Sequence, residues 1–167
     1  MSPIKQGWEG RCLEDFQVGD VYRCRFGRTV TEADNIQFTL LTNNTNQIHF
    51  NRDYGERSGF GGCLVNSMLT LAIVVGMGAS DISENGIALG WEEVRLPAPV
   101  YGGDTLYSES EVLAVRESRS RPTQGIVSVR TRGYNQRGDL VIDLRRSVLV
   151  WKRAHAPGRD IFPVRQS

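Results

Sequence analysis

The chain has 167 residues, of which 40% are apolar and 23% charged, and its formal net charge is +1. This is the size of one ordinary domain, with enough apolar material for a single core. A charge so close to balance gives no basic stripe for nucleic acid and no field for a membrane surface, so small molecules or proteins are the expected partners.

Three cysteines, Cys12, Cys24 and Cys63, are widely spaced and match no metal-binding or disulfide pattern. We therefore expect reduced thiols and no metal site in a cytoplasmic protein. The N-terminal residues lack the apolar core of a signal peptide, and the longest nearly apolar run, 68–79, is too short to span a bilayer. The sequence predicts a single domain over residues 1–152 and a polar, Pro/Arg-rich C-terminal tail over 153–167.

The first predicted element is a strand over 21–30, where aromatic and β-branched residues alternate loosely with arginine. A helix is expected to follow and to end near residue 42, because Thr31 suits an N-cap and Asp34 falls in the first turn, where the helix dipole favours negative charge. The polar run 43–49 is predicted to be an irregular loop. A short helical turn is expected over 53–57, followed by a glycine-rich bend.

The segment 66–78 is apolar nearly all round, which predicts a helix enclosed on every side. The periodicity then changes to that of strands, and we expect four of them, over 90–96, 104–118, 125–135 and 140–151. Turn-forming residues separate these strands. One buried helix followed by long antiparallel strands indicates an α+β domain whose sheet curls around the helix.

Polar side chains gather around His49, one of only two histidines in the chain. Histidine can accept and return a proton near neutral pH, because its unperturbed pKa is about 6.5. His155 lies in the predicted tail and has no comparable neighbours. His49 is therefore the first candidate for proton transfer, and a histidine that only stabilises its loop is the competing interpretation.

Two motifs give the sequence a family resemblance. One is the stretch 94–106, which reads Val-Arg-Leu-Pro-Ala-Pro-Val-Tyr-Gly-Gly-Asp-Thr-Leu, and the other is the loop that ends at His49. With the order of helix, polar loop, glycine bend and buried helix, they resemble the MaoC-like (R)-specific enoyl-CoA hydratases over roughly residues 16–153. The resemblance implies a hot-dog fold, in which a curved antiparallel sheet wraps around a central helix. It also implies addition of water to an enoyl-CoA, or its removal from a 3-hydroxyacyl-CoA, without a metal or redox cofactor.

In that family the loop typically reads Asp-x-Asn-Pro-x-His, and the aspartate and histidine together hold the water. The resemblance implies that His49 transfers the proton and that Asn46 matches the asparagine of the motif. The aspartate position is Asn44 and the proline position is Gln47. An amide cannot accept a proton as a carboxylate does, so Asn44 is expected to position the water and not to act as a base.

Three consequences of this replacement are open. In the first case His49 acts alone as base and acid. In the second, a nearby acid (Asp34, Asp53 or Glu56) takes the aspartate's role. In the third case the chain is a catalytically silent acyl-CoA-binding subunit whose partner carries the intact pair. A general acid or base contributes about 10²–10⁴ in rate, so its loss slows an enzyme without necessarily abolishing activity.

The start of the buried helix is the second part of the expected site. Relatives often read Val-His-Gly-Met there, whereas this chain reads Val65-Asn66-Ser67-Met68. First-turn N–H groups have no intrahelical partner and can polarise a thioester oxygen whatever the side chains are. The resemblance therefore implies that Val65, Asn66 and Ser67, together with Asn46, bind the substrate. An acyl-CoA thioesterase of the same fold, with Asn66 and Ser67 as weak candidates for its activating groups, is a further alternative.

The resemblance is compatible with substrates that carry a straight acyl chain and with those that carry a short branched dicarboxylic one, such as mesaconyl or itaconyl. The sequence does not distinguish between them. A single curved sheet around one helix leaves an edge strand and a face that need cover, which a two-fold partner provides. Hot-dog proteins that resemble this one are dimers or larger. We therefore expect a homodimer or a higher homo-oligomer, unless the chain is one half of a heterodimer.

Overall fold

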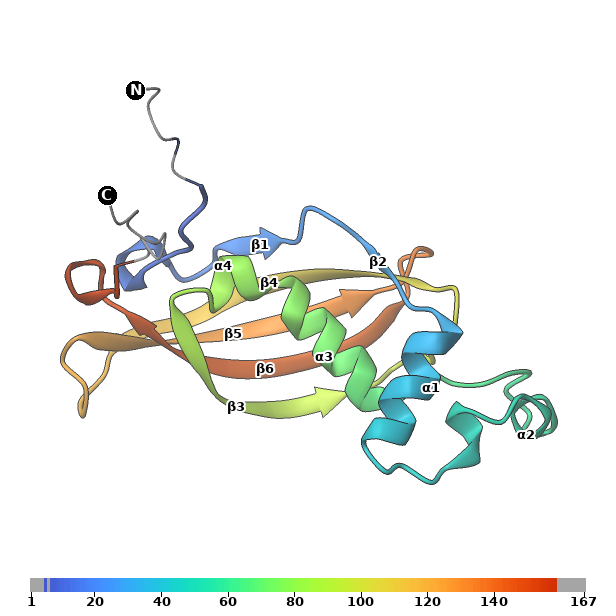
Figure 1. Cartoon of the computed structure of the whole chain (residues 1–167). Helices are drawn as coiled ribbons and strands as arrows, with labels where there is room; N and C mark the ends of the chain where they lie inside the picture. The colour runs from blue at the N-terminus through green and yellow to red at the C-terminus, as the bar shows by residue number, and fades with distance from the viewer. Residues whose placement is uncertain (1–4, 6, 159–167) are drawn as a thin grey trace, which may run out of the picture.

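A computed structural model describes residue 5 and residues 7–158 of the chain (Figure 1). Its centre is a six-stranded antiparallel sheet in the order β1-β4-β5-β6-β3, with β2 paired to β4. The strands are β1 (Val21–Arg23), β2 (Arg28–Thr29), β3 (Gly86–Arg95), β4 (Thr105–Glu117), β5 (Gln124–Tyr134) and β6 (Leu140–Trp151).

The helices lie on one side of this sheet, with α3 running across its concave face (Figure 1). They are α1 (Glu32–Leu41), α2 (Arg52–Arg57), α3 (Ser67–Met77) and α4 (Ala79–Ile82), with short 3₁₀ turns η1 (Leu13–Asp15), η2 (Gln47–His49) and η3 (Arg153–His155). The predicted α+β architecture, a curved antiparallel sheet around one central helix, is confirmed.

Most predicted elements match the observed ones within a few residues, and α1 begins as its cap residue indicated. Thr31 Oγ1 accepts a hydrogen bond from the Asp34 amide at 3.1 Å, and the Asp34 carboxylate accepts one from the Thr31 amide at 2.8 Å. The strand expected over 21–30 is instead divided into β1 and β2. Between these strands Gly27 packs directly against Tyr107, so that a Cβ on this glycine would lie 2.7 Å from the tyrosine ring.

Two hydrophobic clusters fill the concave face, and a polar band crosses the sheet between them. One cluster surrounds α3 and includes Val74 and Leu106; the other lies towards η1 and includes Val112 and Val148. Within the band, Ser108 Oγ donates to Val74 O at 2.9 Å, and the hydroxyls of Ser110 and Thr131 lie 2.9 Å apart. The last member of the band is Arg146 on β6.

Arg146 lies beneath the junction of α3 and α4. Its side chain packs so closely that a Cβ at Gly78 would approach Arg146 Nη2 to 3.1 Å. The residue is 2% exposed, and its Nε and Nη2 have no hydrogen-bond partner among the described residues. Burial lowers the pKa of Arg146 to about 10, because removing the guanidinium from water disfavours its charged form.

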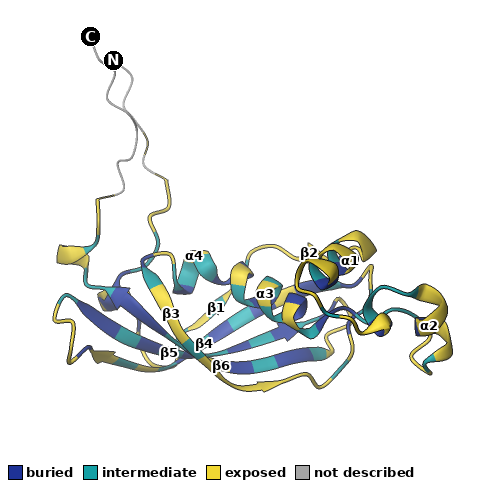
Figure 2. Ribbon diagram, turned by 60° about the horizontal axis from the view of Figure 1, so that its bottom comes forward, coloured by how far each residue is buried: buried dark blue, intermediate teal, exposed yellow. Residues whose placement is uncertain are grey.

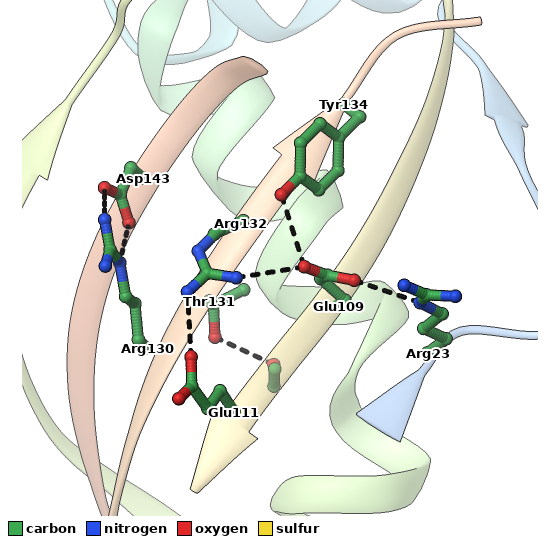
Figure 3. Close-up of polar contacts among 9 residues, drawn as sticks. Arg23, Glu109, Glu111, Arg130, Thr131, Arg132, Tyr134 and Asp143 are labelled. Carbon is green, nitrogen blue, oxygen red and sulfur yellow. Dashed lines mark hydrogen bonds and ion pairs between the residues drawn. The ribbon is translucent and has the colours of Figure 1, made fainter. Parts of the chain in front are cut away.

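The convex face of the sheet carries a network of ion pairs (Figure 3). Glu109 accepts hydrogen bonds from Arg23, Arg132 and Tyr134, at 3.0, 3.1 and 3.2 Å. Partial burial alone would raise the pKa of Glu109, but these donors outweigh it and the pKa is lowered. The convex face is therefore polar and needs no covering layer.

The edge strand β3 is largely exposed (Figure 2) and carries apolar side chains. Alongside it the outer face of α3 is also uncovered: Met68 is 53% exposed, and Ala72 and Gly76 are exposed as well. The expectation that this helix is enclosed on every side is therefore wrong for the single chain. The large apolar side chains exposed on β3 are Ile87, Leu89, Trp91 and Val94.

The start of the predicted tail is attached to the N-terminal turn. The Arg153 amide donates to the Glu14 carboxylate at 3.0 Å, and the Arg153 guanidinium forms an ion pair with Asp15. Residues 159–167 of the expected tail lie outside the described residues. Within the described part, none of the helices has the length and apolar character needed to cross a bilayer, and Cys24 and Cys63 are free thiols.

Candidate active site

A buried amide on α1 holds the expected site together. Asn35, which is 2% exposed, donates through Nδ2 to the carbonyls of His49 at 2.7 Å and Leu64 at 2.9 Å. Its Oδ1 accepts from the Asn66 amide at 2.8 Å. One side chain thus fixes the His49 loop and the start of α3 relative to each other. Asn35 was not among the residues predicted from the sequence, although it stands four residues before the buried Thr39 on the same side of α1.

The ring of His49 is oriented by a backbone carbonyl. Asn46 caps η2 by accepting from the Ile48 amide at 3.3 Å, and His49 ends that turn half-buried. His49 Nδ1 lies 3.0 Å from Leu64 O. A carbonyl oxygen only accepts, so Nδ1 donates in this contact and, in the neutral ring, the lone pair is on Nε2.

Two cavities meet at this ring. The first, which we name the α3 cavity, has a volume of about 270 Å³, and the second, the α2 cavity, has a volume of about 290 Å³. Of the described residues, His49 alone lines both. Besides His49, the α3 cavity is lined by Phe60, Leu64, Val65, Ser67, Thr70 and residues 96–100. The α2 cavity is lined by Glu32, Asn35, Ile36, Phe50, Arg52, Glu56, residues 61–63 and Gly102.

The residues expected to bind substrate divide between cavity wall and scaffold. Val65 and Ser67 line the α3 cavity, and the Ser67 amide, as the first of α3, has no intrahelical partner. Asn66 is buried and caps α3: its Oδ1 accepts from the Met68 amide at 3.0 Å, and its Nδ2 donates to Thr39 Oγ1 at 3.3 Å. The side chains of Asn66 and the exposed Asn46 line neither cavity.

Asn44 also lies outside both cavities. It is half-buried, and its Oδ1 accepts from the Asn46 amide at 3.0 Å, which shapes the turn before η2. Its oxygen is therefore engaged within the loop. A role for its amide group in positioning water stays a prediction.

The three acids considered as substitutes for the missing aspartate have different surroundings. Asp34 completes the cap of α1, and hydrogen bonds from Thr31, with a further one from Arg28, lower its pKa to about 2. Asp53 is paired with Arg57 on the exposed side of α2. Only Glu56 lines a cavity that His49 also lines.

Comparison with known proteins identifies the family. Residues 15–134 match the family model described as a MaoC like domain. The chain belongs to the MaoC-like family. A mesaconyl-CoA hydratase from Cereibacter sphaeroides and a β-methylmalyl-CoA dehydratase from Chloroflexus aurantiacus are each 34% identical to it over 145 residues, or 86% of this chain. The chain spans only 42% and 41% of the lengths of these MaoC-like relatives.

Solved structures of MaoC-like proteins agree with the fold. A MaoC-like dehydratase from Rhodospirillum rubrum is 30% identical, with a TM-score of 0.77 over 86% of this chain and 99% of that one. A MaoC domain protein from Chloroflexus aurantiacus is 31% identical, with a TM-score of 0.84 over 96% of this chain and 46% of that one. A Mycobacterium tuberculosis protein described as a double hot-dog fold aligns with a TM-score of 0.79 at 20% identity, over 93% of this chain and 47% of that one. The predicted family resemblance and the hot-dog fold are confirmed.

Proposed function

We propose that this MaoC-like chain is a hydratase that adds water to the double bond of an enoyl-CoA, or removes it from the 3-hydroxyacyl-CoA. The observation that carries the proposal is the position of His49. Its Nδ1 is fixed on Leu64 O, and its ring forms the shared wall of two cavities at the start of α3. Imidazole held in this way presents Nε2 as a base to whatever the cavities contain.

In the proposed reaction the acyl thioester occupies the α3 cavity and its carbonyl oxygen accepts from the Ser67 amide. His49 Nε2 takes one proton from water while the water oxygen bonds to Cβ of the enoyl group. The electrons of the double bond move to the thioester oxygen, where the backbone donor stabilises the enolate. The imidazolium then returns a proton to Cα, which restores neutral His49. The reaction needs no cofactor other than the CoA of its substrate.

For the acyl group we propose a short branched dicarboxylic chain of the mesaconyl type. Support comes from the two relatives at 34% identity, a mesaconyl-CoA hydratase and a β-methylmalyl-CoA dehydratase. The α3 cavity, with a volume of about 270 Å³, has room for a short acyl group.

A direct assay tests this function. The purified chain is mixed with mesaconyl-CoA and with crotonyl-CoA, and both the absorbance of the conjugated thioester and the free thiol are followed. The proposal predicts loss of absorbance without thiol, faster with mesaconyl-CoA. Release of thiol would indicate a thioesterase instead, and absence of both signals would indicate a silent acyl-CoA-binding subunit.

We also propose that the chain works as a homodimer in the cytoplasm. The open apolar edge of β3 and the uncovered face of α3 support a second hot-dog unit beside the first. The double length of several relatives is consistent with two such units working together. Free thiols at Cys24 and Cys63 fit a reducing compartment. Sedimentation velocity should give twice the mass of the chain, and Leu89→Lys should shift the equilibrium towards the monomer.

A further inference from the structure

We infer that Glu56 is the carboxylate that works with His49 in place of the aspartate that the chain lacks at position 44. The inference rests on the proposed hydratase function. In the family motif the carboxylate stands five residues before the histidine. The inference places it on α2 instead.

The surroundings of the nearby acids single out Glu56. Both oxygens of Glu32, the other acid that lines the α2 cavity, accept from Arg52 Nη2 at 2.8 and 2.7 Å. Asp34 caps α1, and Asp53 is paired with Arg57. Glu56 has no hydrogen bond or ion pair with any described residue, so its carboxylate is available to a water molecule.

The fold holds Glu56 close to the His49 loop. The helix that carries it begins three residues after His49, and Asn51 caps that helix by accepting from the Tyr54 amide at 3.1 Å. Its neighbour Gly55 packs so tightly that a Cβ there would lie 2.7 Å from the backbone carbon of Gly62. Both Gly62 and Cys63 line the α2 cavity, so α2 is pressed against the cavity wall.

The negative charge of Glu56 affects Cys63, another residue that lines this cavity. Burial raises the pKa of the Cys63 thiol, and the negative charges of Glu32 and Glu56 raise it further. Arg52, on the same helix, interacts with the Glu56 carboxylate through charge as well as binding Glu32. Glu56 therefore lines the α2 cavity together with His49 and makes no hydrogen bond or ion pair with any described residue.

This arrangement gives each cavity a separate task. In this proposal a water molecule held at His49, between the two cavities, donates one hydrogen to the Glu56 carboxylate and its other hydrogen to His49 Nε2. When the oxygen bonds to Cβ of the acyl group in the α3 cavity, the second proton moves to Nε2 and later to Cα. Glu56 takes up no proton in this cycle and stabilises the imidazolium, so the reaction needs no other reactant.

The test compares Glu56→Gln with Asp53→Asn, a matched loss of one carboxylate on the same helix outside the cavity. The wild-type chain and both variants are assayed with mesaconyl-CoA and crotonyl-CoA, and folding is checked by thermal melting. We expect Glu56→Gln to lower kcat by about 10²-fold or more and Asp53→Asn to change it less than twofold. Glu56→Asp, which keeps a carboxylate, should retain more activity than Glu56→Gln.

A third variant tests position 44 directly. If Glu56 has taken over the role, Asn44→Asp should change kcat less than about threefold, since that side chain lines neither cavity. A tenfold gain from Asn44→Asp, or full activity in Glu56→Gln, would overturn the inference while leaving the hydratase function intact. A wild-type chain that hydrates neither thioester would overturn the proposed function, and the inference would fall with it.

Discussion

The two ends of α3 bury polar groups in opposite ways. At its N-terminal end, Asn35 and Asn66 make hydrogen bonds of 2.7 to 3.3 Å to backbone and side-chain partners, and every one of them positions part of the candidate site. At its C-terminal end, Arg146 is equally buried, but two of its three guanidinium nitrogens have no partner within residues 7–158. Buried polar groups therefore hold the candidate site together at one end of α3, whereas the buried guanidinium at the other end destabilises the fold.

Energetics explain the difference. A buried hydrogen bond contributes only about 1 kcal/mol net, but a buried donor or acceptor left without a partner costs about 1–3 kcal/mol. A buried charge without a counter-charge costs several kcal/mol. The helix C-terminus reduces this cost at Arg146, because the negative end of the helix dipole favours a cation.

Removing the central amide of the N-terminal end should have the largest effect on stability. Asn35→Ala leaves the carbonyls of His49 and Leu64 and the amide of Asn66 without their shared partner. We expect a loss of roughly 3 kcal/mol in the free energy of unfolding, measured by urea denaturation. The control Gln37→Ala, at an exposed position of the same helix, should change it by less than about 0.5 kcal/mol. An Asn35 variant as stable as its control would show that the network does not hold this end together.

At the C-terminal end of α3 we expect a substitution to raise the free energy of unfolding. Arg146→Met replaces an unpaired buried cation by an apolar chain of similar length and should raise the free energy of unfolding by about 1–3 kcal/mol at pH 7. The pKa of Arg146 is lowered to about 10, so the cost of burying its charge is complete at pH 7 and falls as the pH rises through 10. Arg145→Met, the neighbouring exposed position, is the control and should have little effect. A destabilised Arg146→Met would mean that the guanidinium has a partner in solution.

A smaller effect is expected where α1 begins. Hydrogen bonds from Thr31, and then from Arg28, lower the pKa of Asp34 to about 2 from its ordinary value of 3.8. The carboxylate therefore contributes stability above about pH 4, and this contribution is lost as the pH falls towards 2. Urea denaturation at pH 5 and pH 2.5 should show a larger loss for the wild type than for Asp34→Asn, by at most about 1 kcal/mol. Equal losses would contradict the assigned shift.

Local patterns in the sequence predicted most of the fold. The cap at Thr31, the apolar run of α3 and the period of β4, β5 and β6 are properties of neighbouring residues, and each element formed where its pattern indicated. The division between β1 and β2 was not predictable, because it depends on the distant ring of Tyr107. Nor was the open face of α3, since apolar composition does not tell which surfaces a single chain leaves uncovered.

The site was predicted only in part for the same reason. The family motif indicated His49 and the start of α3, and both line the α3 cavity. The hydrogen bonds of Asn35 join residues 14 to 31 positions apart, and the α2 cavity brings together α1, α2 and the glycine bend. No local pattern contains such contacts, so the anchoring amide emerged only from the structure, which also singled out Glu56 among the three acids that the sequence had offered.

The most direct measurement of the central claim compares His49→Ala with the wild type in binding and in turnover. Binding of butyryl-CoA, which has no double bond to hydrate, is measured by calorimetry, and hydration of mesaconyl-CoA and crotonyl-CoA by loss of absorbance, with His155→Ala as the control. We predict that His49→Ala binds butyryl-CoA within about threefold of the wild type, while its kcat falls by about 10²–10⁴-fold and His155→Ala is unchanged. Full hydratase activity in His49→Ala would contradict the account.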